Sequence, residues 1–106
     1  DALLGVAREL SGPLFVLDSQ GEAMNSDDFA QLLLDTLRET TRASFVIGGA
    51  EGLPEPLRPG NESELGRVAR HLSLSQMTFP HRLARVLLLE QIFRARELVA
   101  DSGYHR

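Results

Sequence analysis

The chain ends in three consecutive side chains that can all take part in chemistry: Tyr104, His105 and Arg106. A phenol and an imidazole can accept or relay protons, and a guanidinium holds phosphates with a planar fork of donors. Chain ends are usually filled with small or charged residues that no packing requires. The tail is therefore either a frayed polar end or part of a functional site, and its composition leaves both interpretations open.

A glycine-rich segment, "FVIGGAEGLPEP", places Gly48, Gly49 and Glu51 directly after a run of apolar residues. Glycines at the carboxyl end of a parallel strand let a backbone approach a ligand closely, at the edge where open α/β sheets bind ligands. The segment matches neither GxGxxG nor a Walker motif, which requires a lysine that this chain lacks. A tight turn without a ligand explains these residues at least as well.

The segment "LSLSQMTFPH", from Leu72 to His81, combines a short alternating strand with a loop that enters a helix near Pro80. Backbone groups of such a loop can hold a purine or a carboxylate, and the N-terminus of the helix attracts an anion. An ordinary turn between a strand and a helix is an equally good interpretation.

Further candidate groups lie in the last predicted helix. Glu90 and Arg94 are four residues apart, so they form either an ion pair worth about 0.2–0.5 kcal/mol or a pair retained for function or for an interface. His81 could equally be a histidine of the core. The sequence has no cysteine, no His/Asp/Glu cluster with metal spacing and no GxSxG elbow, so we expect neither a metal site nor a Ser/His/acid triad.

Charge is distributed unevenly along the chain. Residues 1–66 carry twelve acids and four arginines, a formal charge of −8, whereas residues 67–106 carry seven arginines and three acids, a charge of +4. All three histidines are in the second part. A basic, histidine-bearing segment indicates a polyanionic partner such as RNA, although a solvated arginine-rich surface would look the same.

The elements that must position these residues follow helix, strand, helix, strand, which predicts an α/β fold in one domain spanning residues 1–106. Buried strands are expected at 14–17 and 43–47 and a short one at 72–75, and polar loops at 19–25 and 50–63. Helices are expected at 2–10, from Ser26 with Phe29, Leu32, Leu33 and Leu37 buried, at 64–70, and at 81–99. The last helix is so apolar that we expect it to be buried on nearly all sides, in a core or against a partner subunit.

No stretch reaches the roughly 20 apolar residues of a membrane-spanning helix, so we expect no membrane association. The absence of cysteine suits a reducing cytosol, so we expect a cytoplasmic protein.

Three motifs taken in order, "VIGGAEGL", "LSLSQMTFPHRLARVLLLEQIFRA" and the terminal "YHR", closely resemble one family. They are similar to the RlmH-type SPOUT methyltransferases, which methylate N3 of a pseudouridine in bacterial large-subunit ribosomal RNA. The resemblance implies a SPOUT α/β fold, a mostly parallel sheet flanked by helices, with a C-terminal trefoil knot, a rare exception to the rule against threaded loops. It also implies S-adenosylmethionine as cofactor, a homodimer and ribosomal RNA as substrate. The family's usual N-terminal strand, loop and helix have no counterpart here, so we expect an N-terminally short domain.

The family's motifs also imply which residues form the site. The resemblance assigns cofactor binding to the following positions: Leu17, Gly48, Gly49, Leu74, Ser75, Gln76, Met77, Thr78 and Phe79. It assigns substrate binding to His81, Arg85 and Arg106, and catalysis to Glu90, Arg94, Tyr104, His105 and Arg106.

The cofactor supplies an activated methyl group, so the protein must orient the base and manage the proton that leaves an imide nitrogen. Our hypothesis is that His105 accepts this proton and that Arg106 holds the RNA. Two alternatives are a non-catalytic knotted dimer that binds S-adenosylmethionine, or an inactive fragment of such an enzyme, and a generic nucleotide-binding α/β domain.

Overall fold

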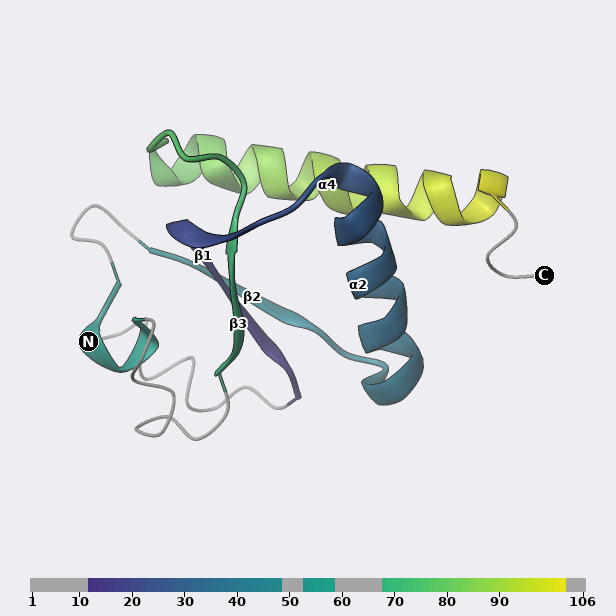
Figure 1. Ribbon diagram of the computed structural model, residues 1–106, viewed down its shortest axis with the longest axis horizontal. Helices are drawn as coiled ribbons and strands as arrows, with labels where there is room; N and C mark the ends of the chain where they lie inside the picture. The colour runs from purple at the N-terminus through teal and green to yellow at the C-terminus, as the bar shows by residue number, and fades with distance from the viewer. Residues whose placement is uncertain (1–11, 49–52, 59–67, 103–106) are drawn as a thin grey trace.

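The computed structural model describes residues 12–48, 53–58 and 68–102 (Figure 1). The elements in these ranges, in chain order, are β1 (Leu14–Ala23), α2 (Ser26–Thr40), β2 (Ser44–Ile47), the 3₁₀ helix η1 (Glu55–Leu57), β3 (Val68–Ser73) and α4 (His81–Ser102). The helix predicted at residues 2–10 lies outside the described residues. The alternation of strands and helices confirms the predicted α/β class.

The described strands form one parallel sheet with the order β2–β1–β3, so β1 is the central strand. Residues 14–17 of β1 are all buried, which explains why the sequence is apolar at four consecutive positions rather than at alternate ones. Phe15 and Leu17 point towards the helices, where they form one core cluster with Phe29 of α2 and Leu88 of α4. The predicted buried strands in β1 and β2 are confirmed.

β1 continues to Ala23, where the sequence predicts a loop. Its pairing with β3 runs to Leu17, opposite Leu72, and resumes at Glu22, so residues 18–21 form an irregular insertion within the strand. An ion pair between Glu22 and Arg70 joins β1 to β3 beyond the insertion. The loop prediction is wrong for residues 19–23 because strand pairing outweighs their polar composition.

Helix α2 begins as predicted at Ser26, but the capping residue is Asn25. The side-chain oxygen of Asn25 accepts a hydrogen bond from the Asp28 N–H at 2.8 Å. The hydroxyl of Ser26, predicted to be the cap, instead donates to Gln91 Oε1 of α4 at 2.7 Å. Phe29 is buried as predicted, but Leu37 is 40% exposed, so the buried face of the helix ends earlier than expected.

Two predictions for the segment between β2 and α4 are wrong. Residues 68–70, expected in a helix, form the start of β3 because they pair with β1. The proline-rich segment, expected to be irregular, forms the single turn η1, in which Pro54 and Pro56 are tolerated because the first turn of a helix needs few N–H donors. Leu57 is completely buried and attaches this turn to the core.

Helix α4 crosses α2 near the N-terminal end of α2 and lies across one end of the sheet (Figure 1). The prediction was burial in a core or against a partner subunit, and within the single chain the core covers only part of α4. Leu88 and Ala95 are buried, but four apolar side chains spaced three or four residues apart, Leu83, Val86, Leu89 and Phe93, are between 44% and 60% exposed. None of the helices in the described ranges is long and apolar enough to cross a membrane.

Candidate functional site

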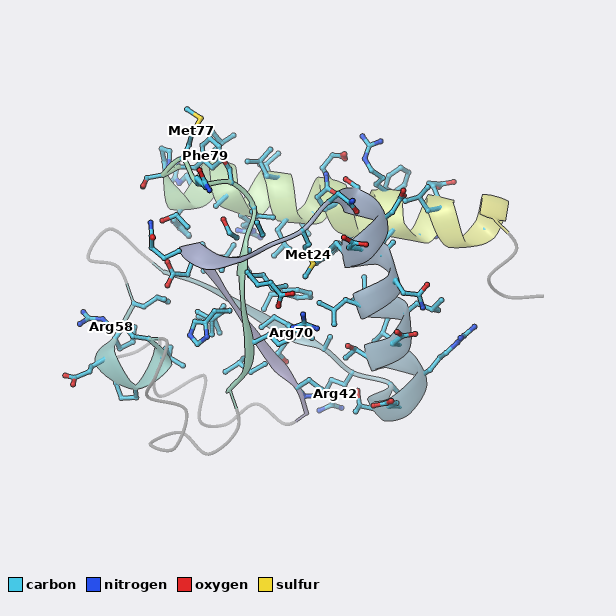
Figure 2. All side chains as sticks on the ribbon, viewed as in Figure 1. Met24, Arg42, Arg58, Arg70, Met77 and Phe79 are labelled. Atoms are coloured by element: carbon cyan, nitrogen blue, oxygen red, sulfur yellow. The ribbon has the colours of Figure 1, made fainter. Side chains whose placement is uncertain are left out.

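A cavity of about 570 Å³ is surrounded by the middle of β1, where its regular pairing with β3 is interrupted, by the carboxyl end of β2 and by the loop after β3. This is the edge at which open parallel sheets bind ligands. Its lining residues are Leu17, Asp18, Ser19, Gln20, Ile47, Gly48, Leu53, Arg58, Leu74, Ser75, Met77, Thr78, Phe79, His81 and Ala84. Figure 2 shows Met77 and Phe79 at one side of this region and Arg58 at the other.

Serine hydroxyls shape the loop between β3 and α4. Ser73 is buried, and its Oγ lies 2.8 Å from the carbonyl oxygen of Ser75 and 3.2 Å from that of Ser19. The Met77 N–H donates to Ser75 Oγ at 3.0 Å, which closes a turn of the kind that serine favours. Ser73 therefore joins the β1 insertion to the loop, and these two segments form adjacent walls of the cavity.

The N-terminus of α4 forms another wall. The Ala84 N–H donates to the carbonyl oxygen of Pro80 at 3.0 Å, so the first turn begins at the predicted proline. His81 and Ala84 both line the cavity. The positive end of the helix dipole therefore lies beside any ligand bound there.

Most of the cavity wall is apolar, with a few polar side chains at defined positions, which is typical of a small-molecule site. Asp18 Oδ1 accepts a hydrogen bond from the Gln20 N–H at 3.0 Å, so one carboxylate is held on the β1 insertion. Arg58 supplies a cation and His81 an imidazole. Among the described residues there is no cluster of three or more metal-ligating side chains.

Seven of the nine residues predicted to bind a cofactor line this one cavity: Leu17, Gly48, Leu74, Ser75, Met77, Thr78 and Phe79. They come from three separate parts of the sequence. Gln76 is exposed and does not line the cavity, and Gly49 lies outside the described residues.

The predicted substrate-binding and catalytic residues are more dispersed. His81 lines the cavity, whereas Arg85 is exposed on the next turn of α4 and does not line it. Tyr104, His105 and Arg106 lie outside the described residues, so their roles stay predictions.

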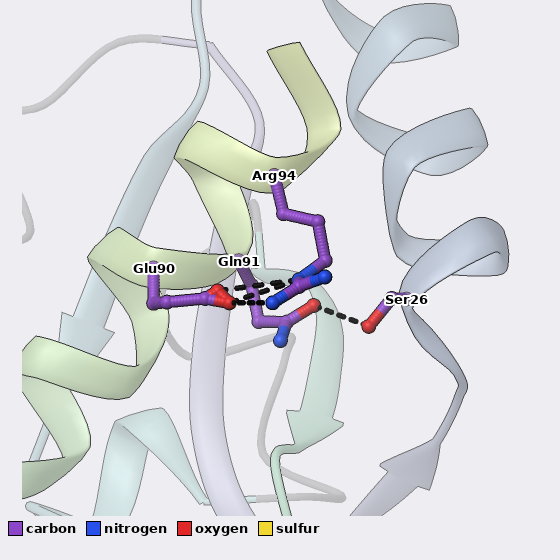
Figure 3. Close-up of polar contacts among 4 residues, drawn as sticks. All are labelled: Ser26, Glu90, Gln91 and Arg94. Carbon is purple, nitrogen blue, oxygen red and sulfur yellow. Dashed lines mark hydrogen bonds and ion pairs between the residues drawn. The ribbon is translucent and has the colours of Figure 1, made fainter. Parts of the chain in front are cut away.

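Glu90 and Arg94 form an ion pair on α4, with Arg94 Nη2 2.7 Å from Glu90 Oε1 (Figure 3). The hydrogen bond from Arg94 to Glu90, together with their charge attraction, raises the pKa of Arg94. Glu90 is nine residues beyond His81, about 13 Å along the helix axis, and neither member of the pair lines the cavity. The structure therefore separates this pair from the cavity within one chain.

Sequence reasoning missed Asp18 and Arg58, an acid and an arginine among the described residues of the cavity wall. Asp18 belongs to the β1 insertion and Arg58 follows η1, neither of which was predicted. The signal for Asp18 was present, since it directly follows a buried strand of a parallel sheet.

A family model described as "Predicted SPOUT methyltransferase" matches residues 6–105. The chain belongs to the SPOUT methyltransferase family. It is 46% identical over 93 residues to the Ribosomal RNA large subunit methyltransferase H of Parasynechococcus marenigrum (strain WH8102), which covers 88% of this chain and 58% of that protein.

Proteins of two further organisms have the same name and are also similar to this chain. The identity is 37% over 105 residues with the protein of Paracoccus denitrificans (strain Pd 1222), covering 99% of this chain and 63% of the relative. The identity is 42% over 94 residues with the protein of Coprothermobacter proteolyticus, and the match covers 86% of this chain and 61% of that relative. The chain thus spans about three fifths of the length of these relatives.

Proposed function

We propose that this SPOUT-family chain is an enzyme that methylates large-subunit ribosomal RNA with S-adenosylmethionine as cofactor, at N3 of a pseudouridine. The observation that carries the proposal is the convergence of Leu17, Gly48 and the 74–79 loop on one cavity. Family membership and the names of the relatives support the reaction and the substrate.

The cavity has properties suited to S-adenosylmethionine. Its volume of about 570 Å³ is within the usual range of small-molecule sites, about 300–1,000 Å³. Apolar side chains such as Leu17, Ile47 and Leu74 can pack against a purine, and Gly48 allows close approach to the backbone. Asp18 and Arg58 provide one group of each charge for the amino-acid end of the cofactor. Bound there, the cofactor supplies an activated methyl group.

The task of the chain's own residues is then to orient the base, exclude water and remove one proton. We assign contact with the nucleotide to be methylated to His81, and its position in the cavity wall at the N-terminus of α4 supports this assignment. We assign removal of the N3 proton to His105 or Tyr104, and RNA binding to Arg85 and Arg106. Replacement of His105 by alanine is expected to slow single-turnover methyl transfer by about 100-fold or more, and an unchanged rate would remove this assignment.

Glu90 and Arg94 lie away from the cavity of their own chain, so we propose that they act in the active site of a second subunit. A homodimer is supported by the exposed apolar face of α4, defined by Leu83, Val86, Leu89 and Phe93, because such a patch is normally covered by a partner. We also propose that the C-terminal segment forms the family's trefoil knot in one domain spanning residues 1–106, and that the protein acts in the cytoplasm, where ribosomes are found.

Methyl transfer from radiolabelled S-adenosylmethionine to ribosomes that lack the modification tests the proposal. We expect one methyl group per ribosome, located at N3 of a single pseudouridine by mass spectrometry of RNA digests. Cofactor binding without transfer would instead support the alternative, a non-catalytic knotted dimer or an inactive fragment. A parallel assay on free large subunits identifies which particle is the substrate.

A further inference from the structure

The segment Leu53–Arg58 forms the wall of the cavity opposite the 74–79 loop, and its geometry is held by three hydrogen bonds. The N–H groups of Leu57 and Arg58 donate to the carbonyl oxygens of Pro54 and Glu55, each at 3.0 Å. The side chain of Arg58 folds back so that Nε donates to the Leu53 carbonyl oxygen at 3.0 Å. This bond orients the guanidinium and leaves its two terminal amino groups for a ligand.

The same segment is attached to the sheet by His71 of β3. His71 Nε2 lies 2.7 Å from the carbonyl oxygen of Leu57, and Leu57 is itself completely buried. Because a carbonyl oxygen only accepts hydrogen bonds, Nε2 carries the proton in this contact. His71 pairs with the buried Val16 of the central strand, so its bond to Leu57 attaches the segment that carries Arg58 to the centre of the sheet.

The charges near Arg58 favour a single carboxylate over a polyanion. Asp18 lines the same cavity, so the described residues of the wall offer the carboxylate of Asp18 and the guanidinium of Arg58. An α-amino acid group, which carries one ammonium and one carboxylate, matches this pair of charges.

We propose that Arg58 binds the amino-acid carboxylate of S-adenosylmethionine and that His71 positions it to do so. This inference rests on the proposed function, because it assigns the cofactor's amino-acid end to the wall formed by Leu53–Arg58. The cofactor's purine then lies towards the 74–79 loop, at the other side of the cavity in Figure 2. In this proposal Arg58 selects ligands that carry the carboxylate, and His71 acts only by positioning Arg58.

Calorimetric titration with S-adenosylmethionine and with its decarboxylated form tests Arg58, because the two ligands differ only in the carboxylate. For R58Q we expect the affinity for S-adenosylmethionine to fall about tenfold, the size expected for a charge-assisted hydrogen bond that is partly open to solvent. The affinity for the decarboxylated ligand should change less than about twofold, and R58K should show an intermediate loss because lysine lacks the planar fork.

Any one of four outcomes would overturn the inference. Unchanged affinity of R58Q for S-adenosylmethionine removes the proposed contact, and equal loss for both ligands makes Arg58 a structural residue only. Unchanged cofactor affinity combined with weaker, less salt-dependent binding of a ribosomal RNA fragment makes Arg58 an RNA contact. If the wild-type chain binds neither ligand, the proposed function fails and this inference fails with it.

A double-mutant cycle tests the role of His71. H71L removes the donor, and we expect it to reproduce the selective loss seen in R58Q, with no further loss in the double variant, because both changes disable one contact. H71N retains an N–H donor and is expected to restore part of the selectivity. If H71L lowered the affinity for both ligands equally, or if the losses of affinity were additive in the double variant, the positioning role of His71 would be contradicted.

Discussion

At the scale of single residues, Ser73 connects two walls of the cavity through one buried hydroxyl. We expect S73A to destabilise the fold by about 1–2 kcal/mol, because it removes the hydroxyl that hydrogen-bonds the half-buried carbonyl groups of Ser19 and Ser75. Cofactor affinity should fall with it, since the β1 insertion and the 74–79 loop lose their connection. Urea denaturation and calorimetry measure the two effects.

Thr36 provides the matched control for this prediction. Its hydroxyl donates to the Leu32 carbonyl oxygen within α2 at 2.8 Å, far from the cavity. T36A removes a hydrogen bond inside a helix and introduces a better helix former, so its stability should change by less than about 0.5 kcal/mol. Equal effects of S73A and T36A would show that Ser73 has no special role.

Substitution of Arg94 distinguishes a structural role of the Glu90–Arg94 ion pair from a catalytic role. The pKa of Arg94 is raised in the folded state. The stabilisation that its charge provides is therefore fully present at any pH below the pKa of Arg94 in the unfolded chain. This stabilisation is lost only as the pH rises through the pKa of Arg94 in the folded protein, which lies above the pH range of the experiment. We therefore expect R94Q to leave the pH dependence of stability unchanged between pH 5 and about 9, as measured by thermal melts.

R94Q should nevertheless slow methyl transfer if Arg94 acts in the partner's active site. Wild-type transfer rates in this variant would contradict a catalytic role, and a changed stability profile between these pH values would contradict the account of its charge.

At the scale of elements, the close approach of β1 to β3 depends on Gly21. A Cβ at this position would lie 2.8 Å from the carbonyl carbon and oxygen of His71. We expect G21A to destabilise the protein by about 1–3 kcal/mol, because the backbone of β3 must shift. Denaturant unfolding measures the loss.

Gly12 is the comparison for Gly21. Its φ is +81°, but a Cβ there would meet no atom closer than 3.7 Å. G12A should cost only the conformational strain, about 1 kcal/mol. A larger effect at Gly12 than at Gly21 would contradict the proposed close contact.

These elements show what the sequence could predict. The continuous apolar run at residues 14–17 and the mostly apolar segment 43–47 identified the buried parallel strands, and Pro80 identified the start of α4. Residues 18–21 could not be predicted because their conformation depends on how β1 pairs with β3. For the same reason residues 68–70 were assigned to a helix, since local spacing does not report strand pairing.

The sequence could predict those residues of the candidate site that directly follow strands, but not those that tertiary contacts bring to the cavity. Gly48 and the 74–79 loop follow strands directly, so their place at the ligand edge of the sheet follows from the order of elements. Arg58 is brought to the cavity by the buried side chain of Leu57 and by the bond from His71, which are tertiary contacts. Such contacts leave no local pattern in the sequence.

At the scale of the whole molecule, the exposed apolar face of α4 (Leu83, Val86, Leu89 and Phe93) explains why the last helix is so apolar. The sequence could not show whether a core or a partner would cover it. We expect V86D to convert a dimer into a monomer, because a buried charge without a partner is strongly disfavoured. Sedimentation velocity measures the change.

Leu37 gives the control for V86D, since it is 40% exposed but lies on α2. L37D should leave the dimer intact. A monomeric wild-type chain, or dissociation by L37D but not by V86D, would contradict the assignment of this face.

The most direct test of the central claim is titration with S-adenosylhomocysteine of the wild-type chain and of two variants in α4. Ala84 lines the cavity, so A84F should fill it, whereas Ala100 is exposed near the other end of the helix and A100F should not. We predict one ligand bound per chain in the wild type and in A100F, and at least a tenfold loss of affinity in A84F. No binding by the wild type, or equal binding by A84F, would contradict the assignment of this cavity as the cofactor site.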